Sequence, residues 1–239
     1  MVLTLLFLTG LAAGLSRGFS GFGAALIFVP LASALVGPKL AAPILAIIDP
    51  LFASFMILKA LKLADKRDVS LMFVGAILGV PLGTAILAHY EPQTLRWLIA
   101  AMAACMLLLL ISGWRYKGQP HAMATAGVGA IAGLFTGIAQ IGGPTVVCYW
   151  MGTDTDHQKL RANIILYFAA SSVLTIATYL YGGLMSLNVL QLSLIAGPAY
   201  GLGILGGSQA FPFASANFFR TSSLVLIAFA VIISLPIFK

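Results

Sequence analysis

The sequence predicts an all-α polytopic membrane protein made of two inverted repeats, each with about five helical segments. Three observations lead to this prediction: an extreme apolar composition, apolar runs of membrane-spanning length, and a glycine pattern that recurs halfway along the chain. Of the 239 residues, 61% are hydrophobic and only 8% are charged, whereas ordinary soluble domains carry about 25% charged residues. With a mean hydropathy of +1.05, the chain has too little polar surface to coat a soluble globule.

This composition excludes a soluble enzyme, a disordered chain, a disulfide scaffold and an ordinary nucleic-acid-binding protein. In a membrane protein, the net charge of +7 is typical of basic cytoplasmic loops. Cys105 and Cys148 lie in separate apolar runs and form no CxxC pair, so they support neither a redox relay nor a metal site. Because the sequence also lacks an HExxH motif, we expect no enzyme, no metal and no cofactor.

The apolar runs define the expected segments, since a spanning helix needs about 20 apolar residues. Single spans are predicted at 40–59, 70–89, 94–113, 160–181, 188–209 and 217–238. Two longer stretches, 2–36 and 122–152, are broken near the middle by glycine. Their arms of about 15–18 residues would reach roughly 22–27 Å, which is short for a core of about 30 Å. We therefore expect re-entrant or tilted hairpins whose glycine-rich turns lie deep in the membrane.

The glycine pattern of the first broken stretch recurs in the second at a constant offset of 119. The recurring residues are Gly10, Gly14, Gly18 and Gly23 in one stretch, and Gly129, Gly133, Gly137 and Gly142 in the other. The match continues with Lys39 and Lys159 at an offset of 120. The chain is therefore predicted to be one transmembrane domain, spanning 1–239, with repeats at about 1–118 and 119–239.

Lysine and arginine predict the orientation, because cytoplasmic loops are enriched in both. The basic loop 59–68 should be cytoplasmic, and the uncharged loop 182–188 should be external, as should the N-terminus. This topology places nine basic residues inside: Lys59, Lys62, Lys66, Arg67, Arg115, Lys117, Lys159, Arg161 and Arg220. It places three outside: Lys39, Arg96 and Lys239. Since loops 59–68 and 182–188 correspond in the repeat, the halves point in opposite directions, as in many secondary transporters.

Arg17 is the one basic residue that this topology leaves within the membrane, at the first glycine-rich turn. A charge at that depth is costly and usually functional, and a guanidinium matches the oxygens of a carboxylate, sulfonate or phosphate. Alternatively, Arg17 would reach the membrane surface if segment 2–36 were one long helix. Further donors for an anion at this turn are predicted from Ser16, Ser20, Gly21 and Gly23.

The second glycine-rich turn is neutral, so it would supply amide and backbone donors to the same anion. The candidate residues are Gln140, Gly142, Gly143 and Thr145, and Gln140 aligns with Gly21. The alternative is that these glycines only allow tight helix packing. We expect valine at Gly21 or Gly142 to distort the turns, because a β-branched residue resists a positive φ.

Asp49, which precedes Pro50, is the only acidic residue well within a predicted span. It could carry a coupling proton, pair with Arg17, or satisfy backbone groups freed at the proline kink. Asn163 begins a polar series with Tyr167, Ser171 and Ser172 at helical spacing. These side chains could line a path, with Asn163 contacting the substrate, or they could join helices to one another.

Taken together, the motifs resemble the TauE/SafE sulfite exporter family over nearly the whole chain. The similarity rests on the segments Gly14–Gly23, Gly133–Pro144 and Lys159–Asn163. It implies a secondary transporter that moves sulfite, a sulfonate or a related organic anion across the bacterial inner membrane. The expected partners are a small anion and membrane lipid, with no nucleic acid, and the chain would be a monomer or homodimer. The alternatives are a membrane enzyme or assembly factor without transport activity, and an anion channel.

Overall fold

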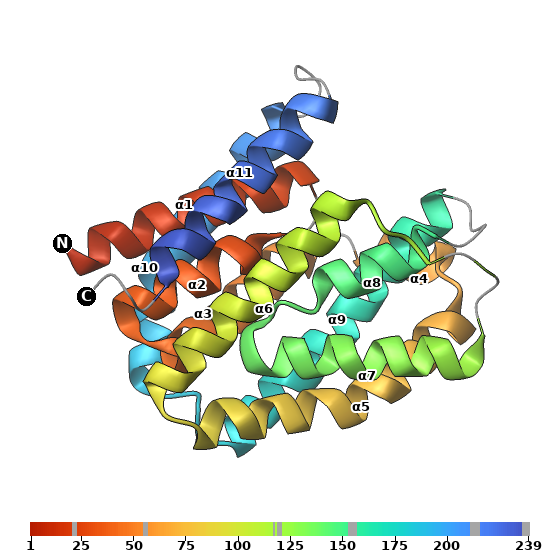
Figure 1. The fold of residues 1–239 in the computed structure, drawn as a ribbon, viewed down its shortest axis with the longest axis horizontal. Coiled ribbons are helices and arrows are strands. Elements are labelled where there is room, and N and C mark those ends of the chain that lie inside the picture. Colours follow the sequence, from red (N-terminus) through yellow and green to blue (C-terminus); the bar gives the residue numbers. More distant parts are fainter. Residues whose placement is uncertain are drawn as a thin grey trace.

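The computed structural model describes residues 1–20, 23–54, 57–116, 118, 121–152, 157–210 and 216–235. Within these ranges the regular structure consists of eleven helices, and no strand occurs (Figure 1). They are α1 (Val2–Ser20), α2 (Ala24–Val36), α3 (Pro38–Ala53), α4 (Ile57–Leu63), α5 (Lys66–His89), α6 (Pro92–Ser112), α7 (Ala122–Ala139), α8 (Gly143–Trp150), α9 (His157–Tyr181), α10 (Leu187–Ala210) and α11 (Ala216–Ser234). The predicted all-α class is confirmed.

Five helices in the described part of the chain are long and apolar enough to cross a membrane, namely α5, α6, α7, α9 and α10. Shorter apolar segments occur in α1, α2 and α11. Large apolar side chains point outward from the spans, as Leu78 and Leu194 do at 67% and 77% exposure. Such a surface is suited to lipid, so the chain is a multi-pass membrane protein.

Two helix pairs pack at very close range, α1 with α10 and α5 with α7. A Cβ atom at Gly14 would overlap the carbonyl oxygen of Tyr200 on α10. On the other pair, a Cβ atom at Gly79 of α5 would overlap the carbonyl oxygen of Ala130 on α7. Glycine is required along these faces because the helix backbones touch, and much of the recurring glycine pattern therefore serves packing.

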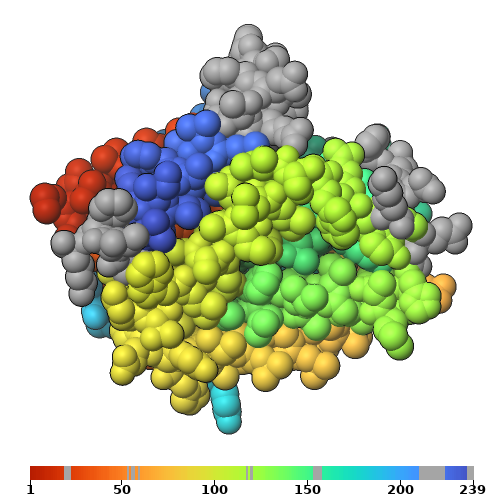
Figure 2. All heavy atoms as spheres, viewed as in Figure 1, coloured from red at the N-terminus to blue at the C-terminus, as the bar shows by residue number. Residues whose placement is uncertain are grey.

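On the face seen in Figure 2, α6 crosses the molecule between α11 and α7 and contacts both helices. Four predicted spans correspond closely to observed helices: 70–89 to α5, 94–113 to α6, 160–181 to α9, and 188–209 to α10. The predicted span 217–238 begins as α11, which ends at Ser234, and residues 236–239 lie outside the described part.

The predicted span 40–59 contains parts of two described helices, and residues 55 and 56 between them lie outside the described part of the structure. Helix α3 ends at Ala53, and α4 begins only at Ile57. Pro43 and Pro50 both lie inside α3, and each removes a backbone donor and crowds the preceding turn. Among the described residues, six helices fall in the first predicted repeat and five in the second.

Both glycine-broken stretches are divided into two helices, but their arms differ in length from the prediction. Helices α1 and α2 have 19 and 13 residues, and α7 and α8 have 18 and 8. At 1.5 Å per residue, α8 extends only about 12 Å, far less than a membrane crossing. Gly23, with φ of 93°, precedes α2, and Gln140, with φ of 60°, ends α7.

The two ends of the molecule carry different sets of connections (Figure 1). The starts of α5, α7 and α9 lie at one end, and the α5–α6 and α9–α10 connections lie at the other. At the first end, Asp65 caps α5 by accepting from the backbone N–H groups of Arg67 and Asp68. We call it the Asp65 end. At the opposite end, Lys39 donates to the carbonyl oxygen of Ala88 at 2.6 Å, near the end of α5.

Candidate functional site

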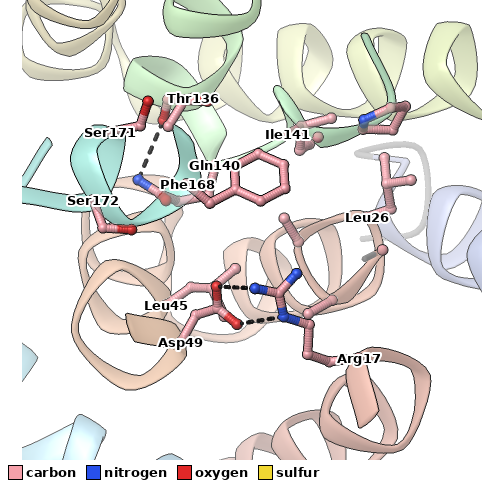
Figure 3. Close-up of a pocket in the computed structure, with 15 residues that line it drawn as sticks. Arg17, Leu26, Leu45, Asp49, Thr136, Gln140, Ile141, Phe168, Ser171 and Ser172 are labelled. Atoms are coloured by element: carbon pink, nitrogen blue, oxygen red, sulfur yellow. Dashed lines mark hydrogen bonds and ion pairs between the residues drawn. The ribbon is translucent and has the colours of Figure 1, made fainter. Parts of the chain in front are cut away.

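A cavity of about 60 Å³ lies between the two glycine-broken segments (Figure 3). The start of α2 and the α7–α8 turn contribute Gly23, Ala24, Gln140, Ile141 and Gly143 to its wall. Three further helices contribute Arg17 from α1, Asp49 from α3, and Phe168, Ser171 and Ser172 from α9. Since about 10–15 Å³ of such space holds one water, the cavity has room for several waters or a small anion.

Arg17 and Asp49 form a two-pronged ion pair in this wall. Nε of Arg17 lies 3.0 Å from Oδ1 of Asp49, and Nη2 donates to Oδ2 at 3.1 Å. The side chains are only 17% and 25% exposed, so each charge compensates the other where an isolated charge would be costly. Of the three alternatives given for Asp49, the structure shows the pairing with Arg17. The alternative, in which Arg17 reaches the membrane surface, required segment 2–36 to be one long helix. The segment instead forms two helices, α1 and α2.

Two aromatic residues hold this pair, and the sequence reasoning missed both. The hydroxyl of Tyr200, which is fully buried on α10, donates to Oδ1 of Asp49. The ring of Phe168 lies 5.9 Å from Cζ of Arg17, within the range of a cation–π interaction. A buried tyrosine hydroxyl generally has a hydrogen-bond partner. The partner of Tyr200 is 151 residues away in the sequence, so no local sequence motif could identify it.

Gln140 stands on the opposite side of the cavity. Figure 3 shows it with Thr136 and Ser171, facing the Arg17–Asp49 pair. Its Nε2 donates to the carbonyl oxygen of Thr136 at 3.3 Å and lies 3.4 Å from the hydroxyl of Tyr179. Its φ of 60° is uncommon for a residue with a side chain. This conformation ends α7 and keeps the amide in the cavity wall.

The N-terminal ends of two helices meet at the cavity. Gly23, Ala24 and Ala25 line it from the start of α2, and Gly143 and Pro144 line it from the start of α8. The first N–H groups of a helix lack partners within the helix and carry the positive end of its dipole. Together with Arg17, these groups favour an anion, and Asp49 opposes it. The arrangement can therefore hold a small anion when the charge of Asp49 is offset.

The structure corrects the reason given for glycine at the second turn. Gly142 has φ of −67°, so the expectation of a positive φ there is wrong. A side chain is excluded by space, because a Cβ atom would overlap the carbonyl oxygen of Ala132 and Oγ1 of Thr136. The positive φ belongs to Gln140 instead. Gly21 and the side chain of Ser20 lie outside the described part of the structure.

Three predicted site residues lie away from the described wall of the cavity. Ser16 is buried one residue before Arg17. Thr145 directs its hydroxyl to Sδ of Met106 at 3.6 Å. Asn163 lies at the Asp65 end, where its Oδ1 accepts from the backbone N–H of Asp65 at 2.7 Å. Contact of these three residues with a ligand stays a prediction.

Fold and cavity together define a multi-pass helical membrane protein with a charged site in its interior, a combination typical of membrane transporters. The sequence matches the family described as Sulfite exporter TauE/SafE over residues 6–235, so the chain belongs to this family. Membership implies a membrane transporter of sulfur-containing anions rather than an enzyme. A search of curated proteins and a search of solved structures each gave no significant match.

Proposed function

We propose that the protein is a secondary transporter that moves sulfite, a sulfonate or a related organic anion across the bacterial inner membrane. In this proposal the anion binds in the cavity between the two glycine-broken segments. The observation that carries the proposal is the position of Arg17 in the cavity wall, close to the N-terminal ends of α2 and α8. Its guanidinium can make two parallel hydrogen bonds to a sulfonate or sulfite.

Asp49 is proposed to couple transport to protons. In the structure the carboxylate of Asp49 binds the guanidinium of Arg17. An anion in the cavity would need the same guanidinium. An arriving anion must therefore either displace this carboxylate or bind when the carboxylate is protonated. In the second case, one proton neutralises Asp49, and the anion takes its place beside Arg17. Proton and anion would then move together, and a pH gradient would drive accumulation.

The proposal includes two inverted repeats, and the helix contacts support it. If α1 and α2 correspond to α7 and α8, then α5 and α6 correspond to α10 and α11. Exchanging the two sets converts the α1–α10 contact into the α7–α5 contact, and the α2–α11 contact into the α8–α6 contact, all of which occur. Helices α1 and α7 also begin at opposite ends of the molecule (Figure 1). This pattern is expected for repeats of opposite orientation.

Flux into proteoliposomes tests the proposal directly. Purified full-length protein would be reconstituted and supplied with radiolabelled methanesulfonate, which stays anionic over the working pH range, so that any pH effect belongs to the protein. The membrane potential would be clamped with potassium and valinomycin. Accumulation above equilibrium that requires a pH gradient supports a coupled transporter. Flux that only follows the anion's own gradient indicates a channel, and the absence of flux contradicts transport of this anion.

The Asp49→Asn variant should lose gradient-driven accumulation. The amide is neutral at every pH, so it mimics the protonated carboxyl group and carries no proton across. We expect uptake with a pH gradient to fall to the level measured without one, while methanesulfonate binding persists. The control is Glu91→Gln, the same change at an exposed acid that caps α6 without a side-chain hydrogen bond. Full gradient-driven uptake by Asp49→Asn would make Asp49 structural.

Cysteine labelling tests the proposed orientation. In a background where Cys105 and Cys148 are replaced by alanine, cysteine would be introduced separately at two exposed positions, Leu187 and Lys66. A membrane-impermeant maleimide added to intact cells should modify the Leu187→Cys variant and spare the Lys66→Cys variant until the membrane is permeabilised. The expectation follows from the nine-to-three division of basic residues. The opposite pattern would place the Asp65 end outside.

A further inference from the structure

Helix α9 carries a row of buried polar side chains that extends along nearly its whole length. The members are Asn163, Tyr167, Ser171, Thr175 and Tyr179, and each is at most 1% exposed. Because residues four apart lie on one face of a helix, the five form a continuous line, which we call the α9 polar stripe. No charged residue belongs to it. A stripe of this kind inside a membrane protein needs partners or a function.

The two parts of the stripe differ in their hydrogen bonding. Toward the end of α9, Thr175 donates to the carbonyl oxygen of Ser171 at 2.7 Å, and Tyr179 donates to that of Gly137 at 2.9 Å. Toward its start, Nδ2 of Asn163, the hydroxyl of Tyr167 and Oγ of Ser171 have no hydrogen-bond partner among the described residues. Tyr167 and Ser171 approach closely enough to interact, but not in hydrogen-bond geometry.

These three atoms come from successive turns and connect two places of different character. Asn163 lies at the Asp65 end, where it accepts from the backbone of Asp65. The carboxylate of Asp65 lies 3.9 Å from Nζ of Lys159, and both side chains are substantially exposed. At the other limit, Ser171 lines the cavity that also contains Asp49. The eight residues between Asn163 and Ser171 cover about 12 Å of helix, so the row joins an exposed end of the protein to the cavity.

We propose that Asn163, Tyr167 and Ser171, with bound water, form the proton pathway between the Asp65 end and Asp49. Buried polar groups without protein partners are usually satisfied by ordered water. A proton enters from solvent at the Asp65 end. Water and each hydroxyl then accept one proton and release another, and the last transfer forms an O–H bond on the Asp49 carboxylate. The inference rests on the proposed function, because it supplies the proton that Asp49 is proposed to carry.

The surroundings of the row favour protons over the anion itself. Tyr167 is fully buried, with the Trp150 ring edge-on at 6.1 Å and the Phe168 ring at 5.7 Å. Uncharged hydroxyl and amide groups enclosed by aromatic rings can order water, but they offer no charge to an anion. Among the described residues, the charged groups lie at the limits of the pathway, and Asp68 interacts electrostatically with the pair at its mouth. Asp65 and Lys159 stand at its mouth, and Arg17 and Tyr200 contact Asp49 in the cavity.

The Tyr167→Phe variant removes one hydroxyl and keeps the ring. We expect methanesulfonate uptake driven by a pH gradient to fall about tenfold, less than the ~10²–10⁴ of a group that is the sole proton donor, because water can partly replace the hydroxyl. Exchange of labelled for unlabelled methanesulfonate at equal pH needs no net proton transfer and should stay within about twofold of wild type. Tyr181→Phe is the matched control, since Tyr181 lies on the same helix and is 98% exposed.

Each outcome has a defined meaning. Selective loss of gradient-driven uptake with intact exchange supports the pathway. Wild-type rates in both assays overturn it, and equal losses in both also overturn it, because the row would then serve the anion route or the structure. If Tyr167→Phe does not give a folded protein by thermal melting, Ser171→Ala is judged by the same ratio of the two rates. Failure of the wild-type protein to take up methanesulfonate would instead contradict transport of this anion, the part of the proposed function on which the pathway rests.

Discussion

The Arg17→Ala variant should lose methanesulfonate affinity by about 10²-fold or more, the scale observed when one member of a buried charged pair is truncated. Arg17 is the one cationic side chain among the described residues of the cavity wall. Its removal takes away the two-pronged donor and leaves Asp49 as an unpaired negative charge beside the incoming anion. Isothermal titration calorimetry on the purified protein measures the change, with thermal melting to confirm that the variant is folded.

Two companion variants separate the causes. Arg17→Lys keeps the charge but lacks the planar fork, so its affinity should lie between those of wild type and Arg17→Ala. Arg17→Ala combined with Asp49→Asn removes the unpaired carboxylate. Binding restored in the double variant would show that repulsion by Asp49 caused the loss, whereas continued loss would show that the guanidinium contacts the anion. Equal affinities of wild type and Arg17→Ala would remove Arg17 from the site.

The Gly129→Ala variant should be strongly destabilised. Gly129 lies on α7 against α5, and a Cβ atom there would overlap the carbonyl oxygen of Met72. The obstacle is backbone, so no side-chain rotation relieves the overlap and the two helices must separate. Overpacking of this kind usually costs about 1–3 kcal/mol, and sometimes more. The expected result is a lower melting temperature in detergent and lower yield of folded protein.

Gly127→Ala provides the matched control for this prediction. Gly127 lies on the same helix two residues earlier, and a Cβ atom there would meet nothing within 4 Å. Alanine favours a helix over glycine by about 1 kcal/mol, so Gly127→Ala should melt at the wild-type temperature or slightly above it. Similar destabilisation of both variants would mean that close contact of α5 and α7 is not the reason for glycine at position 129.

The sequence was sufficient to predict the features that depend on local patterns. Composition and run length identified a helical membrane protein and four spans to within a few residues. The span at 40–59 contains Pro43 and Pro50, which both lie inside α3, and the length of an apolar run takes no account of them. Proline acts on the backbone of the turn before it, and composition averages over that effect.

The candidate site was predictable only where a residue was unusual for its setting. A charge within an apolar segment is rare, so Arg17 and Asp49 could be singled out, and their pairing was one of the alternatives. Phe168 and Tyr200 are ordinary residues for membrane helices, and their roles depend on contacts between helices distant in the sequence. Glycine at position 142 was attributed to a positive φ. The structure instead requires glycine there because a side chain would overlap atoms of α7.

The close packing of α1 against α10 has a consequence for how the protein is made. Helix α1 is synthesised well before α10, the helix that its glycine face contacts. Until α10 has been inserted, the faces at Gly14 and Gly18 lack the backbone surface they fit. Contacts between such distant segments form slowly, because chain closure must precede them. Asp49, the partner of Arg17, also receives a hydrogen bond from the Tyr200 hydroxyl on α10. It therefore has all its partners only after α10 has been inserted. Assembly of the charged site is thus a late event of biogenesis, and a chain truncated before residue 187 would insert without completing it.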